Sequence, residues 1–226
     1  MSWFKTTNNS ASKQGVIIAL ESISGDVLTT QLNELEAELV ATGLTVKHME
    51  FPSPRSKLHI PAVFETPGLL EAPEAIAITS CLDRIVGLAS TIKTQLESEV
   101  ILLTGSPLST AAWLATLVPE YTERIMLYKW LDELEHKVFA QKRIDLTILL
   151  DHDPKYIDLA DAVIPPAGWE NRPAPEIELL RRSYLEAGKL LPNTKIIGCE
   201  KSGLLKPDTD VHNEIWNLVR RIALKK

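Results

Sequence analysis

The chain has 226 residues, of which 45% are hydrophobic and 24% charged, a balance typical of a globular protein that can bury a large core. Its net charge of -6, with Lys and Arg dispersed along the chain, argues against a nucleic-acid partner. Cys81 and Cys199 lie far apart without metal-ligand spacing, which indicates neither a disulfide framework nor a zinc site and favours two partly buried thiols.

The N-terminal segment is polar and lacks the apolar centre of a signal sequence. No later segment approaches the ~18 consecutive apolar residues that span a bilayer. We therefore expect residues 1–13 to be a flexible leader and residues 14–226 to form one domain. The protein is expected to be cytoplasmic, without a membrane partner.

Short apolar runs alternate with helical periodicity along the rest of the chain. Three of the runs are nearly continuous in Val, Ile and Leu, which is typical of strands covered on both faces. The runs cover residues 15–20, 44–50, 99–104, 145–151 and 194–199. Such alternation predicts an α/β fold with an open, doubly wound, five-stranded parallel sheet flanked by helices. Ligands of such sheets bind at the carboxyl ends of the strands.

The helices are predicted from apolar positions that recur every three or four residues. Leu32, Leu35, Leu39 and Val40 give the first helix its apolar face, and this helix ends near Gly43. Further helices are predicted at residues 73–95, 109–117, 127–138, 176–190 and 211–224.

The segment ESISGDVLTTQL follows the first strand, where a phosphate-binding loop would lie. Such a loop holds phosphates with glycine N–H groups, a helix N-terminus and a lysine, and holds Mg²⁺ with a Ser or Thr hydroxyl. Here Val27 replaces the second glycine, Leu28 replaces the lysine, and Asp26 adds a negative charge. Taken alone, the pattern favours an ordinary strand-turn-helix capped by Ser24 or Asp26.

The same segment nevertheless resembles the first motif of the thymidylate kinases, Phe-Glu-Gly-x-Asp-Gly-x-Gly-Lys-Thr-Thr-Gln. The resemblance to this family of P-loop nucleoside monophosphate kinases extends over residues 15–224. Within the motif the chain keeps Glu21, Gly25, Thr29, Thr30, Gln31 and Leu32. The resemblance implies that Glu21, Gly25, Thr29 and Thr30 are what remains of a degenerate phosphate loop.

Two further segments resemble the family's nucleoside monophosphate site. HMEFPSP keeps Phe51 and Pro52 of the segment that closes on substrate, and Arg55 stands in for the missing charged residue. AITSCLDRIVG resembles the segment Phe-x-Ala-Asp/Asn-Arg, which implies that Arg84 grips the 5′-phosphate. The alternatives are a simple proline turn for Phe51 and Pro52, and a solvated surface charge for Arg84 beside Asp83.

Other charged positions of the family are missing. The Asp-Arg pair after the third strand is replaced by residues 104–106, Thr-Gly-Ser, where Ser106 or Ser109 caps the next helix. KRIDLTILLDHDP resembles the strand before the lid, and the lid itself keeps only Arg172. We interpret residues 151–154, DHDP, as a turn whose Asp caps the next helix rather than as a metal-binding pair, so no metal site is predicted.

Phosphoryl transfer relies on cations that hold the phosphates in line, and this chain has lost most of them. The favoured hypothesis is a thymidylate kinase-like pseudoenzyme or regulatory module that binds a dTMP-like nucleotide and needs no cofactor. A second hypothesis is an active dTMP kinase that uses ATP and Mg²⁺, with cations from Arg55, Lys57, Arg84, Arg172 or Arg182. A third is a structural or assembly protein without ligand. The resemblance also implies a homodimer, with one apolar side of residues 127–138 as a candidate contact.

Overall fold

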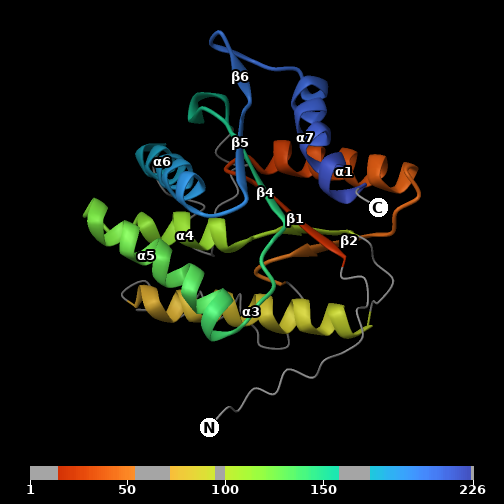
Figure 1. Cartoon of the computed structure of the whole chain (residues 1–226). Coiled ribbons are helices and arrows are strands. Elements are labelled where there is room, and N and C mark those ends of the chain that lie inside the picture. Colours follow the sequence, from red (N-terminus) through yellow and green to blue (C-terminus); the bar gives the residue numbers. More distant parts are fainter. Residues whose placement is uncertain (1–14, 54–71, 95–99, 158–173, 225–226) are drawn as a thin grey trace.

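The computed structural model describes residues 15–53, 72–94, 100–157 and 174–224. Five parallel strands form one sheet in the order β2-β3-β1-β4-β5 (Figure 1). They are β1 (Val16–Ser22), β2 (Val46–Glu50), β3 (Val100–Thr104), β4 (Leu146–Asp151) and β5 (Thr194–Gly198). The predicted doubly wound, five-stranded parallel sheet is therefore confirmed.

Helices cover both faces of the sheet (Figure 1). One face packs against α1 (Gly25–Ala41) and α7 (Asp208–Ala223), and the other against α3 (Pro73–Thr94), α4 (Pro107–Ala115) and α6 (Ala174–Leu190). Outside α4 lies α5 (Tyr121–Glu133), which continues as the π-helical turn η2 (Leu134–Val138). None of the helices among the described residues is long and apolar enough to cross a bilayer.

The strands form where the apolar runs predict them because the sheet is enclosed between these two helical layers. Every residue of β3 is buried, as is every residue of β4 except its last. On α1, Leu32, Leu35 and Leu39 are buried as predicted, whereas Val40 is 53% exposed and does not belong to the apolar face. Cys81 and Cys199 are free thiols and are fully rather than partly buried.

Two further features of the fold differ from the sequence prediction. The helix α5 begins at Tyr121, six residues before the predicted start at Leu127, and its apolar residues Tyr128 and Leu131 pack inside the chain against α4. That apolar side is therefore occupied within the chain. A small hairpin, β6 (Glu200–Lys201) and β7 (Leu204–Leu205), was not predicted, because two-residue strands are too short to show a periodicity.

Candidate functional site

The connection between β1 and α1 consists of Ile23 and Ser24 only. The Ser24 hydroxyl accepts a hydrogen bond from the Val27 N–H, so the interpretation as a strand-turn-helix capped by Ser24 is confirmed. A phosphate loop needs a longer stretch of backbone whose N–H groups converge on an anion. Here Gly25 is already the first residue of the helix, so a loop of that kind does not form.

The residues of α1 in the segment that resembles a phosphate loop lie on different sides of the helix. Thr29 and Thr30 are exposed, while Leu28, at the lysine position, is only 7% exposed. Leu28 belongs to the core between the sheet, α1 and α7, together with residues such as Val211. The side chain that would have to reach the phosphates therefore fills the protein interior.

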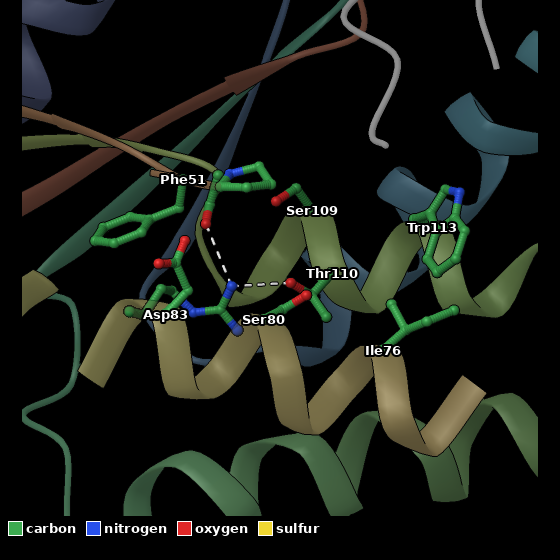
Figure 2. A pocket seen from close by; sticks show the side chains of 10 residues that line it. Phe51, Ile76, Ser80, Asp83, Ser109, Thr110 and Trp113 are labelled. Atoms are coloured by element: carbon green, nitrogen blue, oxygen red, sulfur yellow. Dashed lines mark hydrogen bonds between the residues drawn. The ribbon is translucent and has the colours of Figure 1, made fainter. Parts of the chain in front are cut away.

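A pocket lies at the carboxyl ends of β2 and β3, between α3 and α4 (Figure 2). The space open to water-sized molecules is about 50 Å³. Residues from three separate parts of the chain line this pocket, among them Phe51, Pro52, Ser80, Arg84, Thr110 and Trp113. The structure thus brings Phe51, Pro52 and Arg84 together at one pocket.

The segment Phe51–Ser53 is fixed by contacts at three points. The Phe51 N–H donates to the Thr104 carbonyl over 2.9 Å, and the Ser53 N–H donates to the Asp83 carboxylate over 2.7 Å. The Phe51–Pro52 peptide is cis, and the Phe51 ring is buried against Gly87 of α3. Phe51 is therefore more than part of a simple proline turn, because its ring forms part of the core as well as of the pocket wall.

Arg84 is buried in the pocket wall, so the alternative of a solvated surface charge is wrong. Its Nε donates to Glu135 over 3.0 Å, and its Nη2 makes a second, short contact with the same carboxylate oxygen. Its Nη1 donates to the Thr110 hydroxyl over 2.9 Å and to the Gly105 carbonyl over 3.3 Å, the two bonds drawn in Figure 2. The guanidinium is thus held rigidly and its charge is paired.

Glu135 and Asp83, the two acidic partners at this site, were missed as functional neighbours from the sequence. Glu135 comes from η2, 51 residues from Arg84 along the chain. One signal was available: Glu135 follows Tyr128 by seven residues and Leu131 by four, and therefore falls on the apolar side of its helix. A carboxylate on such a face has to find a buried partner.

Glu21 lies near the end of β1 and is buried beside the same group of residues. Its Oε1 accepts the Ser106 N–H over 2.6 Å, at the N-terminus of α4, where the Ser106 hydroxyl in turn accepts the Leu108 N–H. Burial raises the pKa of Glu21 to about 7, although the bonds from Ser106 and the charge of Arg84 oppose this rise. Of the two caps considered for this helix, the structure shows Ser106.

The raised pKa of Glu21 predicts a pH-dependent stability. The stabilisation of the protonated folded form is fully present below the ordinary value of 4.5 and is lost as the pH rises through about 7. The loss is about 3 kcal/mol, from ~1.4 kcal/mol per pKa unit. Glu21→Gln keeps an acceptor for Ser106 but cannot ionise, so it is expected to gain about this much stability over the wild type between pH 4.5 and 8.

Urea unfolding of the wild type and of Glu21→Gln across this pH range measures the difference in their unfolding free energies directly. The contributions of other titrating groups are the same in both proteins and cancel in this difference. His152 is one such group, because burial lowers its pKa and gives the opposite slope. A difference in unfolding free energy that does not change with pH would contradict the assignment of a raised pKa to Glu21.

The DHDP segment forms the predicted turn. Asp151 accepts two hydrogen bonds from Arg181 of α6, over 2.7 Å and 3.0 Å, and Asp153 caps the short helix η3 (Pro154–Tyr156) by accepting the Lys155 N–H. Arg181 therefore links α6 to the sheet. Within the described residues, no three His, Cys, Asp or Glu side chains gather closely enough to hold a metal ion.

Several predicted site residues are not brought to this pocket. Gly25, Thr29 and Thr30 belong to α1 and are not among the described residues that line it. The predicted cations Arg55, Lys57 and Arg172 and the predicted leader lie outside the described residues. Arg182 is on the surface of α6, where its Nε lies 3.9 Å from the Glu178 carboxylate.

Comparison with known proteins adds no identification, because no family model matches the chain and no curated protein is significantly similar to it in sequence.

Proposed function

We propose that the chain is a thymidylate kinase-like protein that does not transfer phosphate from ATP and acts as a binding or regulatory module. Its ligand is a small molecule of the dTMP type, taken up at the pocket between α3 and α4. The observation that carries the proposal is the two-residue connection between β1 and α1, with Leu28 in the core where a lysine is needed. Cytoplasmic location and a homodimer, both implied earlier, belong to the same proposal.

The absence of transfer follows from the charges at the carboxyl edge of the sheet. Phosphoryl transfer needs cations or helix N-termini aimed at the phosphates, each supplying several kcal/mol of stabilisation in a dry site. In the described residues three such places carry a carboxylate of the chain itself: Asp26 at α1, Glu21 at α4, and Glu135 on Arg84. A triphosphate would therefore meet an acidic side chain of the protein at each of them.

A ligand pocket is supported by its position and its lining. It lies at the strand ends where open α/β sheets bind their ligands. Aromatic and aliphatic walls from Phe51, Ile76 and Trp113 stand beside the hydroxyls of Ser109 and Thr110, the combination that small-molecule sites use for burial and orientation. Figure 2 shows Ile76 on α3 opposite Trp113 on α4.

Calorimetric titration of the full chain with dTMP and, separately, with Mg-ATP tests the proposal. Saturable heat with dTMP and none with Mg-ATP is the expected result. Saturation by Mg-ATP followed by ADP release in a coupled assay would show an active kinase and would contradict it.

Restoring the missing loop residues is expected to fail. Val27→Gly with Leu28→Lys should create no affinity for Mg-ATP, because position 28 points into the core and residues 25–28 are helical. The same change should lower the free energy of unfolding by about 3 kcal/mol or more, since a buried leucine is lost and a glycine is placed within the helix. Thr29→Ala, at an exposed neighbouring position, is the control and should change neither quantity. Saturable binding of Mg-ATP by the double variant would contradict this account of the loop.

A ligand-free structural protein is the second candidate, favoured by one observation. Arg84 and Phe51 are both tied into the core by contacts that need no ligand to explain them. Under this alternative neither dTMP nor an uncharged relative produces saturable heat.

A further inference from the structure

The charges around the pocket decide which form of a nucleoside-type ligand it can hold. Arg84 is the one cation among the described lining residues, and it is paired with Glu135. Asp83 is also in the lining and is buried with its carboxylate bonded to the Ser53 N–H. Glu21 lies behind them, close enough to interact with Arg84. The carboxylates of this cluster therefore outnumber its guanidinium, and its net charge is negative.

The groups that would hold a phosphate are already engaged. The Nε, Nη1 and Nη2 atoms of Arg84 all donate to protein oxygens. At the N-terminus of α4, the Ser106 N–H donates to Glu21 and the Leu108 N–H to the Ser106 hydroxyl. A phosphate that took over either place would leave a buried carboxylate without its partner, which is strongly unfavourable.

The size of the pocket suits a small ligand group. Its free space of about 50 Å³ corresponds to about four water molecules, at ~10–15 Å³ for each. That space is of the order of one ring. The Trp113 side chain supplies aromatic surface for such a ring, and the Ser80 and Ser109 hydroxyls supply hydrogen-bonding groups at its edge.

We propose that this pocket binds an uncharged heterocyclic ring, as in a nucleoside, in preference to the corresponding 5′-monophosphate. The inference rests on the proposed function, since it takes the pocket to be a nucleoside-type site and specifies the ligand's charge. It assigns Glu135 as a specificity-determining residue, because Glu135 neutralises the guanidinium that a phosphate would require.

Calorimetric titrations of the wild-type chain with thymidine and with dTMP, in the same buffer near pH 7.5, test this inference. Thymidine is expected to bind at least about tenfold more tightly than dTMP, as a like-charge contact disfavours the phosphate. Tighter binding of dTMP would overturn the inference and leave the proposed function standing. Absence of saturable heat with both ligands would overturn the proposed function and the inference together.

A charge substitution gives the second test. Glu135→Gln removes the charge that neutralises the guanidinium of Arg84 and is expected to shift the ratio of the two dissociation constants toward dTMP by about tenfold or more. Glu133→Gln is the matched control: it removes the same charge from the neighbouring exposed pair with Lys137 and is expected to leave the ratio unchanged. An equal ratio in wild type and Glu135→Gln would overturn the role of Glu135. If Glu135→Gln does not fold, the wild-type comparison alone decides the inference.

Discussion

Glu135→Gln is expected to lower the free energy of unfolding by about 3 to 5 kcal/mol, the usual cost of leaving a buried charge unpaired. The side chains of Arg84 and Glu135 are 4% and 5% exposed, so water cannot replace the lost partner. Arg84→Met is expected to cost a similar amount, because it strands Glu135 in the same place. The double variant should be more stable than the sum of the two losses predicts, since it leaves neither charge alone.

Urea unfolding of the four proteins gives the coupling energy of this pair. The exposed pair of Lys137 and Glu133 is the control, for which the corresponding variants should cost less than about 1 kcal/mol. Single-variant losses below about 1 kcal/mol at Arg84 and Glu135 would show that the pair is hydrated, and would remove the basis for calling Arg84 neutralised.

Gly105→Ala is expected to destabilise the protein by more than about 4 kcal/mol, the range reserved for severe packing conflicts. Gly105 has a φ of +74°, and a Cβ atom there would lie 1.7 Å from the carbonyl oxygen of Phe51. The turn between β3 and α4 passes directly against the backbone of the Phe51–Pro52 segment. Relieving the overlap therefore requires the backbone to move at the wall of the pocket.

Gly43→Ala separates the cost of the positive φ from the cost of the overlap with Phe51. Gly43 has a similar φ of +86°, but nothing lies within 4 Å of the added methyl group. Only the backbone cost of about 1 kcal/mol is expected there. Thermal or urea unfolding of both variants provides the comparison, and equal losses at the two positions would contradict the close contact between Gly105 and Phe51.

The sheet could be predicted from the sequence because strands enclosed on both faces are continuously apolar. The runs ending at Thr104 and Asp151 match β3 and β4 to within one residue. The start of α5 was missed for a local reason: Glu120 precedes this helix without making a side-chain cap, so no capping signal marks the boundary.

The pocket could be predicted only in part. Phe51, Pro52 and Arg84 each follow or face a strand end, and the topology brings such positions together. Arg84 and its partner Glu135 are 51 positions apart in the sequence, and Ser53 and its partner Asp83 are 30 positions apart. Local sequence patterns do not encode contacts over such separations. Family membership and ligand class remain predictions, since the fold is compatible with many activities.

The connection between β1 and α1 shows how local preferences decide the structure of a segment that resembles a motif. Ser24 is a strong N-cap, and the leucines that follow it continue the apolar face of the helix from Leu28 onward. With no second glycine to hold a loop open, the chain enters the helix at Gly25. The lysine position consequently becomes a core position, which the motif comparison alone could not reveal.

The central claim is that the chain's own carboxylates occupy the places where a kinase holds phosphate. A single-turnover assay tests it most directly: the wild-type chain in excess over dTMP, with Mg-ATP present, and dTDP as the product measured. No dTDP above the level of the uncatalysed control is the predicted result. Formation of dTDP that scales with the concentration of the chain would contradict the claim.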